Sequence, residues 1–350
     1  MPAERTVLVT GVAGNLGTRL LPMLSDFRVV GVDMRPPENS LSLSRFEQMD
    51  LGREASCWRL IELLRETGAT SVVHLAFILD PLRSGVLDLE RMWQINVAGT
   101  ARVMEAVSVV NRTGGHVGQF IFSSSVSAYG PETPGPVKED APLGAHTLPY
   151  AIHKRESDEV VRYRAQSLGD CRVYILRPHI FTGATMQNYM VGALRGTPLG
   201  KSKRATRMRA AGKRLPLMLP FGRKYLEKQI QFVHVDDVGR LLVYLLRRPA
   251  TDLPLTILNV AGRGECITIQ RCAEIANAEV KRVPRAVCRP ILGALWKWGI
   301  SSIPPAALPY MIGSYTMDTT RLQNLLGENY PRIIQYTIED ALRDSFDRSG

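Results

Sequence analysis

Short apolar runs alternate with longer amphipathic stretches through the first half of the chain. The apolar runs occupy residues 6–10, 28–33, 71–76, 119–125 and 172–177, and a further strand that ends in an acid is expected at 46–51. Their length and β-branched content are typical of strands buried on both faces of a parallel sheet. The stretches between them, such as 87–110 and 147–167, have the period of helices. This alternation predicts an α/β fold with a doubly wound parallel sheet.

The alternation stops after Pro178 and returns only at residue 230. A strand at 230–235, a helix at 236–248 and a strand at 255–259 are then expected, and smaller helices follow to the end of the chain. We therefore predict two parts, a sheet domain of residues 1–177 and 231–262 and a smaller, mostly helical lobe of residues 178–230 and 263–350.

Two further stretches lead to packing predictions. In the helix expected after residue 51, the spacing of Trp58, Leu60, Ile61 and Leu64 predicts that all four face the core. The uncharged stretch 298–317 contains three prolines that would interrupt a spanning helix, so no stable membrane insertion is predicted. Core packing, an apolar roof over a hydrophobic substrate and interfacial membrane contact remain three interpretations of it.

Length and cysteine content narrow the class of protein. A chain of 350 residues with 45% hydrophobic residues can bury a sizeable core. Its five cysteines are odd in number and have no metal-ligand spacing, which predicts reduced thiols and no metal site. The N-terminal residues lead directly into the first strand without the features of a signal or transit peptide. A cytoplasmic protein is therefore expected.

The formal net charge of +11 is concentrated in the segment Lys201–Lys228, whose single acid is Glu227. Few aromatic residues accompany this segment and no nucleic-acid motif does, so no nucleic-acid partner is predicted. Three interpretations remain for it: a solvated loop, an electrostatic funnel for an anionic substrate, or a contact with an acidic partner or anionic lipid.

The first strand runs into a glycine-rich turn and a helix that begins near Asn15. Gly11 allows the tight turn, Gly14 lets a pyrophosphate approach the backbone, and Gly17 lets the helix pack against the strand. The free N–H groups at the helix start then point at the phosphates. Strand, glycines and helix together predict a Rossmann-type site for a dinucleotide.

The second strand ends in Asp33, at the distance where an acid meets the adenosine ribose hydroxyls. A 2′-phosphate would meet a like charge there, so NAD is predicted over NADP. Arg35 is the residue that could soften this preference.

Tyr150 and Lys154 are four residues apart, which places them on one face of a helix. An ammonium beside a phenol favours phenolate, and moving its pKa from about 10 towards 7 requires about 4 kcal/mol. Tyr150 would then exchange a proton as hydride moves to or from a carbon atom. The strand ending in Ser123, Ser124 and Ser125 adds a hydroxyl that can polarise the substrate oxygen, and the chemistry alone does not choose among the three.

The sequence resembles the extended short-chain dehydrogenase/reductases, the NAD-dependent epimerase/dehydratase family. The matching segments are Thr10–Gly17, Asp33, Asp50–Leu51, His74–Ala76, Asn96–Thr100, Ser123–Gly130, Tyr150–Lys154, Leu176–Pro178, Phe232–Asp237 and Asn259–Gly262. They occur in the family's order, whereas the tail after residue 262 resembles the family only loosely.

The resemblance implies roles for individual residues. Tyr150 would be the acid/base, Lys154 would bind the nicotinamide ribose and Ser125 would be the catalytic hydroxyl. Asp50 and Leu51 would meet the adenine, and Asn96 would support the central strands. The remaining residues expected to contact NAD are Gly11, Gly14, Asn15, Leu16, Gly17, Asp33, Leu75, Ala76, Ser123 and Pro178. A homodimer is expected on the resemblance alone. The histidines at 74, 153, 179 and 234 are predicted to be buried polar residues.

Two departures from the family bear on the substrate. Sugar-nucleotide members carry an Arg-Asp pair before the Phe-Val-His-Val stretch, and this Arg helps to hold the nucleotide phosphates; this chain has Ile230 and Gln231 there. After Arg177 and Pro178 the family commonly has Gly-Asn-Val-Tyr-Gly-Pro, where this chain has residues 179–184, His-Ile-Phe-Thr-Gly-Ala. We therefore predict an NAD-dependent oxidoreductase that acts on a hydroxyl or carbonyl of a small metabolite. A nucleotide-sugar epimerase or dehydratase that recycles NAD in each turnover is the alternative, and a non-catalytic NAD-sensing protein is the third hypothesis.

Overall fold

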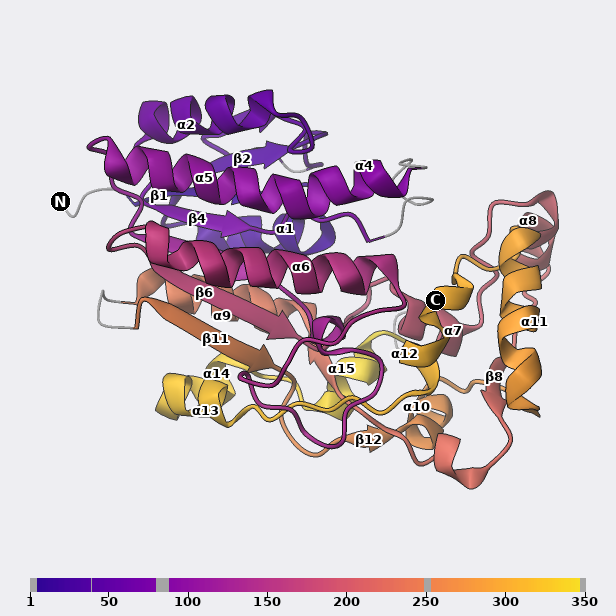
Figure 1. Ribbon diagram of the computed structural model, residues 1–350. Coiled ribbons are helices and arrows are strands. Elements are labelled where there is room, and N and C mark those ends of the chain that lie inside the picture. Colours follow the sequence, from indigo (N-terminus) through magenta and orange to yellow (C-terminus); the bar gives the residue numbers. More distant parts are fainter. Residues whose placement is uncertain (1–4, 39, 80–87, 249–252, 347–350) are drawn as a thin grey trace. The chain divides into compact units, whose positions relative to one another are not determined.

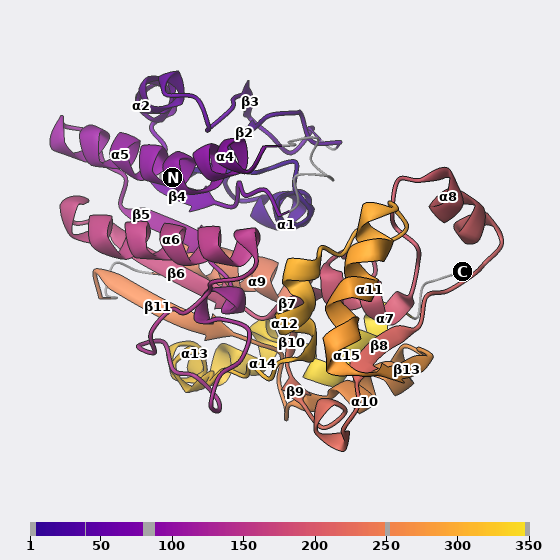
Figure 2. The same ribbon diagram turned by 45° about the vertical axis from the view of Figure 1, so that its right-hand side comes forward.

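A computed structural model describes residues 5–38, 40–79, 88–248 and 253–346 of the chain (Figures 1 and 2). The chain divides into two compact units. The first comprises residues 1–128, 150–177 and 236–258, and the second comprises 129–149, 178–235 and 259–350.

A seven-stranded sheet forms the centre of the first unit. Its strands are β1 (Thr6–Thr10), β2 (Arg28–Asp33), β3 (Arg45–Gln48), β4 (Ser71–His74), β5 (Gln119–Ser123), β6 (Arg172–Pro178) and β11 (Leu255–Val260). Their order is β11-β6-β5-β4-β1-β2-β3, and the pairs from β3 to β6 are parallel. The order reverses on either side of β1, so the carboxyl ends of β1 and β4 lie where ligands bind in doubly wound sheets.

The helices of the first unit cover this sheet. They are α1 (Asn15–Leu20), α2 (Ala55–Thr67), α4 (Leu89–Trp93), α5 (Gly99–Arg112), α6 (Pro149–Arg164) and α9 (Val235–Arg247). Helices α2 and α5 lie side by side over one face (Figure 1). The core there includes Leu8 and Val72 from the sheet with Leu60 and Met104 from the helices, all at most 1% exposed. The predicted doubly wound sheet is confirmed.

Two sequence expectations for the first unit were wrong in detail. Trp58 is 73% exposed, because the buried side of α2 runs through Leu60, Ile61 and Leu64. The single helix expected over 87–110 is interrupted by a π-helical turn at Gln94–Ala98, which separates α4 from α5.

The second unit combines small sheets with short helices. Its strands are β7 (Ile180–Thr182), β8 (Leu217–Pro220), β9 (Gln229–Ile230), β10 (Phe232–His234), β12 (Ile267–Thr268) and β13 (Val280–Val283). Its helices are α7 (Tyr189–Arg195), α8 (Lys203–Ala210), α10 (Ile269–Ile275), α11 (Arg285–Lys297), α12 (Leu308–Ile312), α13 (Thr320–Leu326), α14 (Tyr330–Ile333) and α15 (Ile338–Asp344). The strands pair as β7 with β10, β9 with β12 and β8 with β13.

The strand expected at 230–235 is divided in two by Gln231, which is 6% exposed. The Gln231 side chain donates to the Met317 carbonyl oxygen at 3.2 Å and accepts from the Met317 N–H at 2.8 Å. Because the residue is bound to that segment, β9 and β10 join different two-stranded sheets instead of forming one continuous strand.

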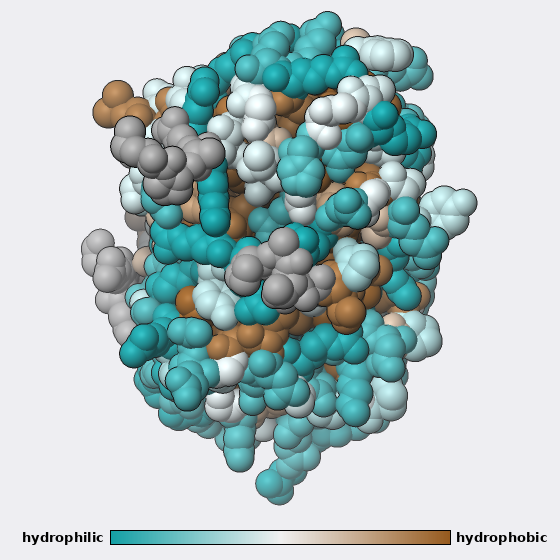
Figure 3. Space-filling view, turned by 90° about the vertical axis from the view of Figure 1, so that its left-hand side faces the viewer, coloured by the Kyte–Doolittle hydropathy of each residue, from teal (hydrophilic) through white to brown (hydrophobic). Residues whose placement is uncertain are grey.

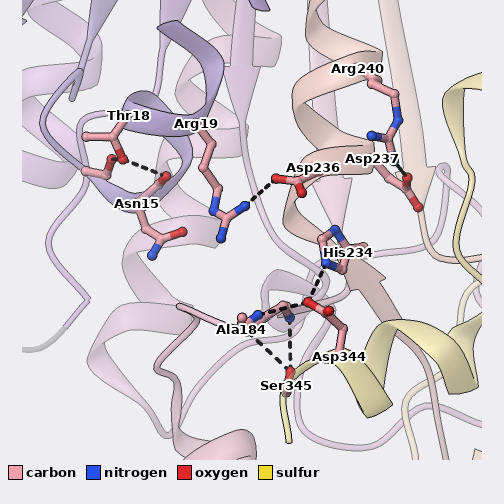
Figure 4. Close-up of polar contacts among 12 residues, drawn as sticks. Asn15, Thr18, Arg19, Ala184, His234, Asp236, Asp237, Arg240, Asp344 and Ser345 are labelled. Atoms are coloured by element: carbon pink, nitrogen blue, oxygen red, sulfur yellow. Dashed lines mark hydrogen bonds and ion pairs between the residues drawn. The ribbon is translucent and has the colours of Figure 1, made fainter. Parts of the chain in front are cut away.

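Asp344 and Ser345 at the end of α15 hold the β7 turn (Figure 4). Asp344 accepts from the Ala184 N–H at 3.0 Å and lies 3.1 Å from His234 Nε2. Ser345 accepts from the Gly183 N–H at 3.0 Å. The C-terminal helix therefore supplies acceptors for two backbone groups that follow β7.

The molecular face drawn in Figure 3 is largely hydrophilic, and hydrophobic side chains reach it in separate areas. Such scattered exposure is normal for folded proteins. Among the described residues, no helix is long and apolar enough to cross a membrane.

Candidate active site

The glycine turn after β1 is closely packed. Gly11 has φ of 74°, and its N–H donates to the Val32 carbonyl oxygen at 2.8 Å. A Cβ on Gly11 would lie 2.5 Å from the Ala76 nitrogen, and one on Gly17 would lie 2.5 Å from the Gly11 oxygen. Helix α1 begins at Asn15, where it was expected. The turn therefore has the backbone approach that the predicted dinucleotide site requires.

Asp33 ends β2 beside this turn and accepts from the Ala13 N–H at 3.0 Å through Oδ2. Its second oxygen is 3.4 Å from the Arg35 N–H. A carboxylate has about four acceptor sites, so both contacts leave capacity for ribose hydroxyls. The bond to Ala13 also fixes the carboxylate against the glycine turn.

Asp50 and Leu51 follow the carboxyl end of β3, which is parallel to β2 and therefore ends at the same edge of the sheet as Asp33. Asp50 accepts from the Gly52 N–H at 2.9 Å and forms ion pairs with Arg91 and Arg53. Leu51 is 4% exposed. These contacts fix the segment where the adenine is predicted to bind.

A buried chain of hydrogen bonds joins the end of β4 to the helices. Thr100 donates to the Asn96 carbonyl oxygen at 2.6 Å, so it accepts from His74 Nε2 at 2.9 Å. Nδ1 of His74 then accepts from the Thr10 hydroxyl at 2.6 Å. The ring is neutral, and burial lowers its pKa to about 3. This confirms the interpretation of His74 as a buried polar residue.

Asn96 holds the segment that follows β4. Its Oδ1 accepts from the Ile78 N–H at 2.7 Å, and its Nδ2 donates to the Ile78 carbonyl oxygen at 2.9 Å. Nδ2 is also 3.3 Å from His153 Nδ1. The π-helical turn presents this side chain inward, and Leu75 and Ala76 lie in the segment that it stabilises. Leu75 donates its N–H to the Thr10 carbonyl oxygen at 3.0 Å.

The three serines after β5 have different partners. The Ser123 carbonyl oxygen accepts from Lys154 Nζ at 2.6 Å, and Ser124 Oγ donates to Asp158 Oδ2 at 2.6 Å. Ser125 Oγ accepts from the N–H and the hydroxyl of Ser127 at 3.1 and 2.9 Å. Of the three serines, Ser125 is the one whose hydroxyl acts to lower the pKa of Tyr150.

Lys154 lies beneath an aromatic side chain that the sequence analysis did not select. Its Nζ is 3.5 Å from the centre of the Phe77 ring and 5.9 Å from that of Tyr150. The Phe77 and Tyr150 rings meet edge to face, with centres 5.7 Å apart. An ammonium over a ring is stabilised electrostatically. Phe77 therefore contacts both members of the Tyr150–Lys154 pair.

Burial perturbs the pKa values of this pair in opposite directions. It lowers the pKa of Lys154 to about 7, against the opposing effect of the Asp158 carboxylate. It raises the pKa of Tyr150 to about 12, although the Ser125 hydrogen bond acts to lower it. In the protein alone, Tyr150 is thus a protonated phenol. The lowering expected from sequence requires a further positive charge, which an oxidised nicotinamide carries.

Arg177 and Asp158 form a fully buried ion pair near the site. Arg177 donates to Asp158 through Nε at 2.9 Å and through Nη2 at 2.8 Å, and both side chains are 0% exposed. Asp158 is one helical turn beyond Lys154 on α6. Arg177 was visible in sequence only as part of a motif, and nothing in the local pattern identified Asp158 as its partner.

The other predicted cofactor residues lie at different positions. Leu16 belongs to α1, where the Thr18 hydroxyl lies 3.1 Å from the Asn15 and Gly14 carbonyl oxygens and donates to them (Figure 4). The next residue, Arg19, forms a 2.6 Å ion pair with Asp236 of α9. Pro178 ends β6 and belongs to the second unit. Among the described residues, no cluster of His, Cys, Asp and Glu could hold a metal ion.

A sequence model of the NAD dependent epimerase/dehydratase family matches residues 7–261. The chain belongs to this family. Among curated relatives, the UDP-glucose 4-epimerase of Haemophilus influenzae is 27% identical over 273 residues, 74% of this chain and 78% of the relative. That of Erwinia amylovora is 32% identical over 186 residues, 49% of this chain and 52% of the relative.

Solved structures show the same fold. A UDP-glucuronic acid 4-epimerase from Bacillus cereus, in complex with UDP-glucuronic acid and NAD, aligns over 98% of both chains. The TM-score is 0.66 at 20% sequence identity. Together with the family match, this confirms the predicted extended short-chain dehydrogenase/reductase type, the Rossmann-type fold, the enzymatic class and NAD as cofactor. The roles of individual residues stay predictions.

Proposed function

We propose that this enzyme transfers hydride at a hydroxyl-bearing or carbonyl carbon of a small substrate, with Tyr150 as acid/base. The observation that carries the proposal is the buried Lys154 side chain, whose Nζ lies 5.9 Å from the centre of the Tyr150 ring and 3.5 Å from that of Phe77. Ser125 would hold the substrate oxygen together with Tyr150, and Lys154 would bind the nicotinamide ribose. Bound NAD would supply the hydride acceptor.

The proton path follows from the site's own groups. Oxidation of an alcohol requires Tyr150 to take up the hydroxyl proton, and reduction requires Tyr150 to donate one. With a pKa of about 12 in the protein alone, the phenol is poised to donate. Positive charge from Lys154 and from oxidised nicotinamide favours the phenolate that accepts a proton.

The favoured substrate lacks a nucleotide diphosphate. Ile230, which replaces the family's phosphate-binding arginine, is 1% exposed and packs in the core of the second unit. Both the nitrogen and the oxygen of the Gln231 side-chain amide are hydrogen-bonded to the backbone of Met317. Neither side chain is available to a pyrophosphate, which supports a small metabolite as substrate.

A nucleotide-sugar epimerase or dehydratase is the second candidate, and the relatives favour it. The two curated relatives described above are both UDP-glucose 4-epimerases. In that reaction NAD would be reduced and reoxidised within one turnover, so no NADH would accumulate.

Incubation with NAD and each substrate class separates the two candidates. The enzyme with UDP-glucose and catalytic NAD should give no UDP-galactose by NMR if the first candidate is correct. Small hydroxy compounds with stoichiometric NAD should then give NADH. Formation of UDP-galactose, lost in Tyr150→Phe, would establish the second candidate instead. A wild-type enzyme that transfers no hydride to any tested substrate would favour a non-catalytic NAD-sensing role.

The cofactor preference tests the role of Asp33. NAD should bind at least about tenfold tighter than NADP, a difference of about 1.4 kcal/mol. Isothermal titration of both into the protein measures it, and Asp33→Asn should narrow the gap. Equal affinities in the wild type would mean that Arg35 captures the 2′-phosphate.

Two expectations complete the proposal. By resemblance to the family, the enzyme would form a homodimer, which light scattering on the purified protein tests. It would also act in the cytoplasm, which cell fractionation tests.

A further inference from the structure

Two long segments of the chain contain no acidic residue. They are residues 171–226 and 280–317. Within the second unit they carry Arg195, Lys201, Lys203, Arg204, Arg207, Arg209, Lys213, Arg214, Arg223, Lys224, Lys281, Arg282, Arg285, Arg289 and Lys297. Most of the chain's net charge of +11 therefore comes from these two segments.

The fold brings the two acid-free segments together. Strand β13 pairs in parallel with β8, from Val280 opposite Leu217 to Val283 opposite Pro220. The Gly200 N–H donates to the Ile300 carbonyl oxygen at 2.9 Å, and the Ser202 N–H donates to that of Gly299 at 3.0 Å. These bonds hold the start of α8 against the residues that follow α11. Charged residues from the two segments therefore lie close together there.

Part of this charge is committed to the protein itself. Arg209 and Arg214 donate to backbone carbonyl oxygens. Arg223 forms an ion pair with Glu227, and Lys281 forms one with Glu279. The two glutamates lie just outside the acid-free segments. Nine other exposed cations of these segments, which we call the cationic face, are Lys203, Arg204, Arg207, Lys213, Lys224, Arg282, Arg285, Arg289 and Lys297.

Two tryptophans border the cationic face. Trp296 is 40% exposed and Trp298 is 61% exposed, with Lys297 between them. Trp298 is followed by Gly299, whose carbonyl binds Ser202 at the start of α8. On α11, Arg285, Arg289 and Trp296 are spaced by four and seven residues, which places them on one side of the helix.

We propose that the cationic face binds peripherally to a bilayer surface that carries anionic phospholipids. Basic side chains near such a surface are attracted by its negative potential. Tryptophan prefers the headgroup region, where its ring is buried and its N–H stays hydrated. Because neither segment contains an acidic side chain, neither adds a negative charge that the anionic headgroups would repel.

A bilayer fits the aromatic arrangement better than a nucleic acid does. Single-stranded nucleic acids are held by aromatic rings along a groove, on which successive bases stack. Here the exposed tryptophans stand together at the end of α11, beside cations from α8. This arrangement presents an aromatic anchor surrounded by charge, as interfacial helices do. A peripheral mode agrees with the finding that no described helix can span a membrane.

Vesicle flotation tests the proposal on the full chain. The wild type should float with vesicles of phosphatidylcholine and phosphatidylglycerol at low salt, and not with phosphatidylcholine alone. Lys203→Glu with Arg207→Glu should reduce partitioning by about tenfold or more, since each basic residue near the surface contributes measurably. The control Arg28→Glu with Arg162→Glu makes the same change of net charge on exposed residues of the first unit and should retain binding.

Tryptophan variants give an independent readout. Trp296→Ala with Trp298→Ala should weaken flotation and remove the blue shift of fluorescence that vesicles produce, whereas Trp58→Ala, exposed to 73% in the first unit, should do neither. The proposal is overturned if wild type fails to float with anionic vesicles or binds neutral ones equally. It is also overturned if the control charge variant loses as much, or if only an oligonucleotide binds. Circular dichroism verifies that each variant is folded.

Discussion

The buried pair of Arg177 and Asp158 offers a sharp test of how burial sets the strength of an ion pair. Replacing Asp158 with Asn keeps the side chain's shape and its acceptor for Ser124, and removes its charge. Arg177 then remains fully buried and loses the negative charge of Asp158. Breaking a buried pair in this way costs about 3–5 kcal/mol of unfolding free energy.

The first unit also contains a matched exposed pair. Arg247 donates to Asp26 through Nε at 3.0 Å and Nη2 at 2.7 Å, which is nearly the geometry of the buried pair. Its side chains are about half exposed, at 52% and 50%. Asp26→Asn should therefore cost at most about 1 kcal/mol. The two substitutions differ in burial far more than in hydrogen-bond geometry.

Urea unfolding can follow the first unit alone. Two of the four tryptophans, Trp58 and Trp93, belong to that unit, so a Trp296→Phe, Trp298→Phe background confines the fluorescence to it. Replacing both buried partners, as Arg177→Met with Asp158→Leu, should restore much of the loss, because no charge is then left unpaired. If Asp158→Asn and Asp26→Asn cost the same, the argument from burial is refuted.

Three further predictions concern the site and its surroundings. Tyr150→Phe should lower turnover about 10²–10⁴-fold and leave NAD affinity nearly unchanged, whereas Lys154→Met should lower both turnover and NAD affinity. Turnover is measured by nicotinamide absorbance, and a near-normal value in Tyr150→Phe would exclude Tyr150 as the acid/base. Phe77→Ala removes the ring that covers Lys154 Nζ. Because burial is what lowers the pKa of Lys154 to about 7, this pKa should rise, and NAD affinity should weaken at a higher pH than in the wild type; an unchanged pH profile would show that the ring does not act on Lys154. Burial lowers the pKa of His74 to about 3 and of His179 to about 4, so below pH 6.5 the unfolded chain binds protons that the folded chain does not. The free energy of unfolding should therefore fall between pH 6.5 and 5, by about 1.4 kcal/mol per pH unit for each ring. Urea midpoints measure this, and an undiminished slope in His179→Gln would contradict it.

The parts of the fold that sequence predicted are those with strong local signals. The apolar runs and the glycine turn report contacts within a few residues of one another, so β1, α1 and the position of Asp33 followed directly. The buried histidines were also predicted correctly. Trp58 was assigned to the core because a helical spacing cannot separate neighbouring faces of a helix near the edge of its buried stripe.

The features that sequence could not predict depend on residues far apart in the chain. Phe77 meets Lys154 only when α6 packs near the end of β4, and Asp158 meets Arg177 only when α6 packs against β6. The different partners of Ser123 and Ser124 depend on Lys154 and Asp158, which are 31 and 34 residues further along the chain. The division of the strand at 230–235 depends on Met317, 86 residues away.

The positions of Asp344 and Ser345 predict the effect of a mutation near the 3′ end of the coding sequence. A premature stop codon that removed both residues would leave the Gly183 and Ala184 N–H groups without the acceptors that α15 supplies, and it would take the carboxylate from His234. The loss falls on the β7 turn and on strand β10, so the second unit would be destabilised although the Tyr150–Lys154 pair is intact. A truncated allele of this kind would reduce the amount of enzyme in the cell through degradation, whereas an allele altered at Tyr150 would leave a normal amount of inactive enzyme.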